Sequence, residues 1–126
     1  MTVKYNIVER ANPTNRAAPK KFYASIRSSG RVTTRELAER AAQMSTLTTV
    51  DVMAAIESFL AIVSAELAKG NIVELGDFGS LWLRMSSEGA ETAEEVRADR
   101  IGSVMPRFNP GKEFKRVLDA IKFNKN

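Results

Sequence analysis

The segment from Thr48 to Gly70 constrains the fold of this chain more than any other. It opens with Thr48 and Asp51 in the spacing of a capping box, and it closes with Gly70, a residue type that commonly follows a helix C-terminus. Large apolar residues recur between them every three or four positions, which predicts a long helix with one wide apolar face. These residues are Val52, Ile56, Phe59, Leu60, Val63 and Leu67. One short neighbouring helix cannot cover such a face, so the sequence favours a dimer.

Shorter patterns on both sides of this segment predict a mixed α+β fold. Thr33 and Glu36 form a second capping-box pattern, and a short helix is expected after Thr33. Strands are expected where apolar and polar residues alternate. These strands cover residues 3–7, 22–26, 72–75, 81–85 and 101–105. After a break at Pro110 and Gly111, a terminal helix is expected over residues 112–123.

Composition excludes several classes of function. The chain has 126 residues and contains neither Cys nor His. Without Cys there is no disulfide or thiolate metal site, and without His the commonest general base is absent. We therefore expect no catalytic residue, metal, cofactor or small-molecule substrate. The N-terminus lacks the apolar core of a signal peptide, and no apolar run is long enough to span a membrane. A cytoplasmic protein without a membrane partner is expected.

The distribution of charge indicates more than its total. The net charge is +4 with a pI near 9.6, which permits a nucleic-acid partner. Residues 1–35 contain nine charged residues, of which only Glu9 is acidic. Residues 107–126 contain six basic and two acidic residues, whereas residues 88–100 contain five acidic and two basic ones. Both ends are therefore basic, and an acidic patch lies between them.

Three sequence matches resemble the HU and integration-host-factor family of bacterial histone-like proteins. Residues 36–70 have the spacing of the family's two helices and end on its Leu-Ala-Lys-Gly. Asp77-Phe78-Gly79 stands where the family has Gly-Phe-Gly. Residues 105–112 match Val-Pro-x-Phe-x-Pro-Gly-Lys, which is the most specific of the three. The resemblance covers Thr33 to Lys122, or 90 of the 126 residues.

The resemblance implies an intertwined homodimer with a helix pair, a β-sheet that sends out a two-stranded arm, and a C-terminal helix. In this family the arms enter the DNA minor groove, and a proline at each tip wedges between base pairs. Residues 32–126 would form the HU-like DNA-binding domain, with the arm at about residues 84–104. Residues 1–31 would be a β-extension packed on that domain. The implied function is architectural, largely sequence-nonspecific binding of duplex DNA in the nucleoid.

The resemblance also places DNA-binding residues at the arm base and on the terminal helix. Arg84 matches an arginine at the base of the family's arm, and Lys112 and Lys115 match lysines that follow its Pro-Gly. Arg107 and Arg116 lie beside these positions and are expected to contact phosphates with them.

Two further pairs of basic residues leave alternatives open. Arg97 and Arg100, on the returning arm strand, either reach a phosphate or pair with the neighbouring Glu94 and Glu95, and pairing is favoured. Lys20-Lys21 precedes two aromatic residues, Phe22 and Tyr23, which either stack on bases or pack inward, and inward packing is favoured. Trp82 either lies exposed between the arms or packs on the extension. The core is expected to contain Phe59, Phe78, Phe108 and Phe114.

The predicted arm tip departs from the family. Residues 88–95 contain four glutamates and no proline, so the tip would face DNA with like charge and without a wedge. This departure is the reason for an alternative to DNA binding, in which the chain is an HU-fold dimeric interaction module with weak or lost DNA binding. Such a module would use its acidic arm or its N-terminal extension to bind a protein partner. Asp77 also replaces the first family glycine, so a slightly different turn is expected there.

Overall fold

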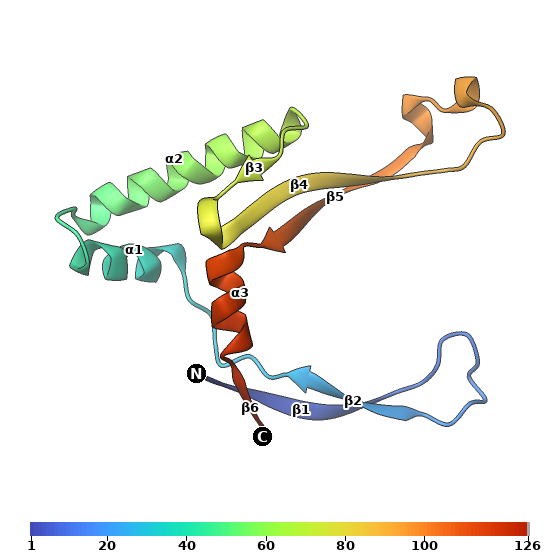
Figure 1. Cartoon of the computed structure of the whole chain (residues 1–126), viewed down its shortest axis with the longest axis horizontal. Helices are drawn as coiled ribbons and strands as arrows, with labels where there is room; N and C mark the ends of the chain where they lie inside the picture. The colour runs from blue at the N-terminus through green and yellow to red at the C-terminus, as the bar shows by residue number, and fades with distance from the viewer. Residues whose placement is uncertain (126) are drawn as a thin grey trace. The chain divides into compact units, whose positions relative to one another are not determined.

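The computed structural model describes residues 1–125, which form three α-helices and six β-strands in two compact units (Figure 1). The central unit comprises Thr34–Arg116. The terminal unit comprises Met1–Thr33 together with the residues from Val117 onward. The predicted mixed α+β class is confirmed. None of the helices in the described chain is long and apolar enough to cross a membrane.

The central unit begins with two packed helices, α1 (Thr34–Gln43) and α2 (Thr49–Ala68). The predicted cap of α2 is confirmed, because Thr48 Oγ1 accepts a hydrogen bond from the Asp51 amide at 3.1 Å and the Asp51 carboxylate accepts one from the Thr48 amide at 3.3 Å. At the other end Gly70 adopts a φ of +88°, and its amide donates to the Leu67 carbonyl at 2.9 Å. This left-handed glycine ends the helix as predicted.

A three-stranded antiparallel sheet completes the fold of the central unit. Its order is β3 (Val73–Glu74), β4 (Gly79–Ser87) and β5 (Ile101–Pro110). β4 and β5 pair from Gly79 and Pro110 to Ser87 and Ile101, and they form the long arm seen in Figure 1. Residues 88–100 connect them through two single 3₁₀ turns at Ala93–Glu95 and Ala98–Arg100. The acidic segment of residues 88–100 therefore lies at the outer end of the paired strands β4 and β5.

Two glycines allow the backbone to close at the base of this arm. The Gly111 amide donates to the Phe78 carbonyl at 2.8 Å, and a Cβ on Gly111 would collide with the Asp77 carbonyl. A Cβ on Gly79 would lie 2.5 Å from the Asn109 carbonyl oxygen. Gly76 takes the left-handed conformation in this turn, with a φ of +60°, so Asp77 needs no glycine. The matched Phe-Gly and Pro-Gly sequences thus meet in a single backbone contact.

The C-terminal helix is shorter than predicted. Helix α3 spans Lys112–Asp119, and β6 (Lys122–Lys125) follows it, so the prediction of a helix to Phe123 is wrong at its end. The Lys122 amide donates to the Met1 carbonyl at 3.0 Å, and Phe123 pairs with Val3 in a parallel ladder. Strand pairing with the N-terminus replaces the last helical turn, and no local periodicity reveals a partner so far away in the sequence.

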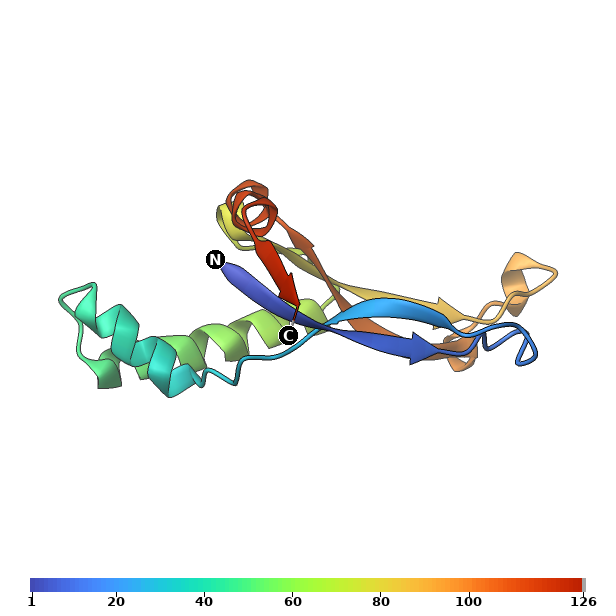
Figure 2. The same cartoon turned by 90° about the horizontal axis from the view of Figure 1, so that it is seen from below.

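The terminal unit is built on a sheet of order β2-β1-β6. Strands β1 (Thr2–Arg10) and β2 (Lys21–Ile26) form a long antiparallel hairpin, which confirms both strands predicted at the N-terminus (Figure 2). The predicted packing of residues 1–31 on an HU-like domain of residues 32–126 stays a prediction. The structure adds that the C-terminal strand belongs to the sheet of the N-terminal hairpin.

The single chain covers very little of its apolar surface. Only Ala38 and Val52 are buried among the hydrophobic residues described. The accessible surface is 10680 Å², whereas a compact monomer of 13.9 kDa exposes about 6,700 Å². Phe59 and Leu60, on the predicted apolar stripe of α2, are each 49% exposed. The prediction that Phe59 is a core residue is therefore wrong within one chain, because the described residues leave about half of its side chain uncovered.

We expect the Gly111→Ala variant to lose about 1–3 kcal/mol of unfolding free energy, because the new methyl group meets backbone atoms that cannot move aside. Gly89→Ala is the matched control, since a Cβ there has open space and the backbone is not left-handed. Urea unfolding of both variants at one protein concentration tests this. Equal stability of the two variants would contradict the backbone contact.

Candidate nucleic-acid interface

The base of the β4–β5 arm presents two arginines on one face. Trp82 pairs with Arg107, and Arg84 pairs with Met105, so these four side chains emerge on the same side of the ribbon. Arg84 and Arg107 line a common hollow of about 220 Å³. Trp82 is half-buried on this face, which we call the arm-base face. Neither β4 nor β5 contains an Asp or Glu, so no carboxylate of these strands neutralises the two cations.

On the opposite face of the ribbon, the arm base packs against α3. Leu81 pairs with Phe108 on this side, and Phe108 packs against two other rings. The Phe78 and Phe114 rings stack with centroids 4.9 Å apart, and Phe108 lies 5.3 Å from Phe78 and 5.9 Å from Phe114. The three rings pack together, but Phe78 and Phe108, exposed to 53% and 39%, are not core residues within one chain as predicted. Phe78 remains 53% exposed, so the cluster is open to a further covering surface.

Helix α3 carries the next set of predicted contacts. Lys112, Lys115 and Arg116 are all exposed. Arg116 Nη1 lies 3.4 Å from a Glu113 carboxylate oxygen, and both side chains are more than half exposed. Such a solvated pair contributes little to the free energy of unfolding, so Arg116 can exchange Glu113 for another anion at a small cost in free energy. Lys112 and Lys115 make no ion pair within residues 1–125.

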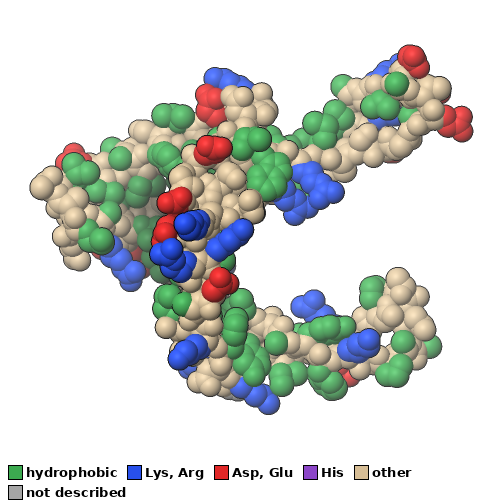
Figure 3. All heavy atoms as spheres, in the orientation of Figure 1, with side chains coloured by type: hydrophobic (Ala, Val, Ile, Leu, Met, Phe, Trp, Pro, Cys, Tyr) green, Lys and Arg blue, Asp and Glu red, His purple; other side chains and the backbone are tan. Residues whose placement is uncertain are grey.

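The charged residues of the arm tip do not form the ion pairs that the sequence analysis favours. Ion pairs join Arg35 to Glu39, Lys69 to Glu66 and Arg116 to Glu113, and within residues 1–125 none joins the arginines of the arm tip to its glutamates. The favoured pairing of Arg97 and Arg100 with Glu94 and Glu95 is therefore wrong. Arg97 is exposed and Arg100 half-buried, while the four tip glutamates are exposed. Figure 3 shows basic side chains near the arm base, and both acidic and basic ones at its outer end.

The aromatic residues beside Lys20 and Lys21 do not pack as expected. Both lysines are exposed, and Phe22 and Tyr23 are 69% and 49% exposed. Successive strand residues point to opposite faces, so Phe22 and Tyr23 cannot both turn inward. The favoured inward packing is wrong within this chain. Lys21 instead pairs with Arg10, a residue that the sequence analysis did not select. The alternation along each strand shows which residues share a face, but only the register between β1 and β2 shows that Arg10 lies opposite Lys21.

The chain is similar in sequence to a protein family and to a protein of known name. A family model named HU-HIG, described as an HU domain fused to wHTH, Ig, or Glycine-rich motif, matches residues 1–125. Integration host factor subunit beta of Azotobacter vinelandii is 36% identical over 89 residues, which cover 67% of this chain and 95% of that protein.

Two solved structures share the fold at low sequence identity. A crystal structure from Bacteroides vulgatus, provisionally described as a bacterial DNA-binding protein, superposes with a TM-score of 0.65 at 14% identity. It covers 98% of this chain, which spans 48% of that structure. HU of Anabaena, crystallised with DNA, superposes with a TM-score of 0.53 at 18% identity and covers 71% of this chain and 98% of its own.

Proposed function

Since this chain belongs to the HU-HIG family of HU-domain proteins, we propose that it binds duplex DNA as an architectural protein with little dependence on base sequence. The observation that carries the proposal is the arm-base face, where Arg84 and Arg107 share one side of a ribbon that contains no acidic residue. A relative 36% identical is named integration host factor subunit beta, and HU of the same fold was crystallised with DNA.

In this proposal the arm-base cations contact the phosphate backbone along the minor groove. Arg84 and Arg107 lie on the arm, and the exposed cations of α3 extend the basic surface. These are Lys112, Lys115 and Arg116, with Arg97 and Arg100 nearer the tip and Lys20 and Lys21 in the terminal unit. Binding is mainly electrostatic, and the proposed place of action is the bacterial nucleoid. Because the tip lacks a proline wedge, the protein bends DNA weakly.

We propose further that the active form is a homodimer. The single chain exposes far more surface than a compact monomer of its mass, and the α2 stripe is open. The excess of about 4,000 Å² per chain is more than the roughly 1,000–2,500 Å² per chain that obligate interfaces of about 2,000–5,000 Å² in total bury, so such an interface fits within it. A second copy supplies the missing cover for Phe59 and Leu60.

The second candidate function remains a dimeric interaction module with weak DNA binding. The central unit contains ten Lys and Arg against thirteen Asp and Glu, so its net charge is −3. Its exposed acidic tip suits a basic protein partner better than a phosphate backbone. The DNA-binding measurements below separate the two functions.

Salt-titrated binding to two unrelated duplexes tests the DNA proposal. Log K should fall linearly with log salt, by about 0.9 per phosphate contact, and should be similar for both sequences. Changing Arg84 and Arg107 together to Gln should reduce the slope by about 1.8. Arg35→Gln is the control, because Arg35 is an exposed cation on α1. Absence of duplex binding at about 50 mM salt would favour the interaction module.

Changing Glu91, Glu94 and Glu95 together to Gln tests the position of the tip. If the arm lies along DNA, removal of the like charge should tighten duplex binding at low salt, and the gain should fade as salt screens it. Glu57→Gln, on α2, is a control for one lost charge. Unchanged affinity would mean that the tip stays away from the duplex.

Light scattering tests the homodimer, with an expected mass of twice 13.9 kDa at micromolar protein concentration. Phe59→Lys places a charge on the open stripe and should shift the protein to monomer or lower its unfolding midpoint. Glu57→Lys, which introduces the same residue at a position that already carries a charge, should leave the mass unchanged. A wild-type midpoint independent of protein concentration would contradict the dimer.

A further inference from the structure

The two units of the chain carry opposite net charge. The terminal unit contains nine Lys and Arg and only two Asp and Glu, a net charge of +7. Its basic residues are Lys4, Arg10, Arg16, Lys20, Lys21, Arg27, Arg31, Lys122 and Lys125. The central unit, which contains the HU-like arm, has a net charge of −3. Attraction to a polyanion must therefore come mainly from the terminal unit.

Strand register places four of these nine basic residues on one face of the terminal sheet. Arg10 pairs with Lys21, and Val8 pairs with Tyr23, so their side chains share a face. Alternation along β1 places Lys4 on the same side. Thr2, also on this side, pairs with Lys122 of β6. We call this surface the basic sheet face, and it is defined by Lys4, Arg10, Lys21, Tyr23 and Lys122.

The one acidic residue of these strands lies on the opposite face, together with several apolar residues. Glu9 is the sole carboxylate of the three strands, and it pairs with Phe22. Ile7 shares this side through alternation, and Phe123 joins it through Val3. No acidic side chain therefore lies on the basic sheet face within the described strands.

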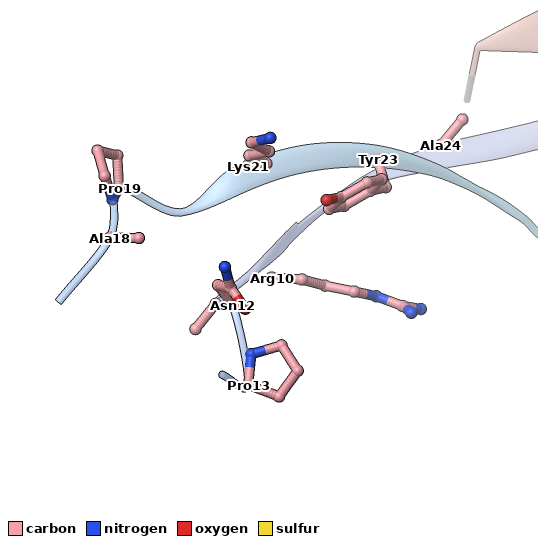
Figure 4. A pocket seen from close by; sticks show the side chains of 9 residues that line it. Arg10, Asn12, Pro13, Ala18, Pro19, Lys21, Tyr23 and Ala24 are labelled. Carbon is pink, nitrogen blue, oxygen red and sulfur yellow. The ribbon is translucent and has the colours of Figure 1, made fainter. Parts of the chain in front are cut away.

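The hairpin end of the basic sheet face is hollowed. Arg10, Lys21 and Tyr23 line a hollow of about 790 Å³ together with residues of the connecting loop (Figure 4). None of the nine lining residues is acidic. The loop is folded by its own side chains, since Asn12 Oδ1 accepts from the Thr14 amide at 2.9 Å and Asn15 Oδ1 accepts from the Ala17 amide at 3.1 Å. Two further cations of this loop, Arg16 and Lys20, are exposed.

The length of this surface fits a polymer better than a single anion. Lys4 and Arg10 are six residues apart on one strand, which corresponds to about 20 Å at 3.3 Å per residue. The same distance along B-DNA spans about six base pairs. A two-stranded antiparallel ribbon also has the width that a DNA groove admits.

We propose that the basic sheet face is a second duplex-DNA contact surface, separate from the arm-base face, and that it supplies most of the electrostatic attraction. This inference rests on the proposed function, because it presupposes duplex binding. Arg10 and Lys21, at the loop end of the hairpin, contact phosphates. Tyr23 lies next to them on the same face, toward the middle of the sheet. The acidic arm is thereby compatible with DNA binding, because attraction comes from a different unit.

The test compares matched pairs of substitutions in the full chain. Changing Arg10 and Lys21 to Gln should reduce the slope of log K against log salt by about 1.8 and weaken duplex binding at least tenfold at about 100 mM salt. Changing Arg31 and Lys125 to Gln removes the same charge from the same unit and should cost much less, because Arg31 lies outside the three strands and Lys125 lies on the face of Glu9. All four positions are exposed, so thermal unfolding should be unchanged.

A hydroxyl-radical footprint distinguishes contact from long-range attraction. The wild-type footprint should shorten by about six base pairs in the Arg10 and Lys21 variant, and not in the Arg31 and Lys125 control. Equal effects of the two pairs, with no change in the footprint, would overturn the second surface and leave the proposed function intact. Failure of the wild-type chain to bind duplex DNA at about 50 mM salt would overturn both.

Two other polyanions provide the remaining outcomes. If Arg10 and Lys21 are needed for binding to phosphatidylserine vesicles but not to duplex DNA, the face is a membrane surface and the inference is wrong. If the chain binds single-stranded DNA more tightly than duplex and Tyr23→Ala abolishes that preference, base stacking is the function of the face, and the duplex proposal for it is also wrong.

Discussion

The arrangement of the central unit depends on one close backbone contact. The Gly111 amide donates to the Phe78 carbonyl at 2.8 Å, and neither Gly111 nor Gly79 has room for a Cβ. This contact joins the turn before β4 to the start of α3. It brings Phe78 and Phe114 into a stack and fixes the base from which the arm extends. The direction of Arg84 and Arg107 follows, because strand alternation turns them away from the aromatic cluster.

The two units that the contacts define also differ in net charge. The central unit has the HU-like architecture but a net charge of −3, and the terminal unit has a net charge of +7. An HU-type arm with glutamates at its tip is a poor source of attraction to phosphates. In the proposed function, the basic sheet face supplies this attraction, because Lys4, Arg10, Lys21 and Lys122 lie on the side opposite to Glu9.

The open apolar surfaces indicate where the structure is incomplete as a single chain. Phe59 on α2 and Phe78 at the arm base are each about half exposed. Burial of a phenylalanine is worth about 1.5–3 kcal/mol, so leaving several in water removes much of the stability that a domain of this size has. In the proposed homodimer a second copy covers these side chains, which is why the dimer and the fold are linked in the proposed function.

The sequence by itself determined the features that depend on neighbouring residues. These local features are the Thr48 and Asp51 cap, the Gly70 helix end, the hairpins and the Phe-Gly and Pro-Gly matches. The fold class and the arm-base residues could be predicted from them. Only the tertiary structure decided what depends on distant pairing. Phe123 is in a strand because Val3 lies beside it, and Arg10 joins Lys21 because the register of β1 and β2 sets them opposite each other. Local propensity cannot reveal such a register, since a shift of one residue would move every side chain to the other face.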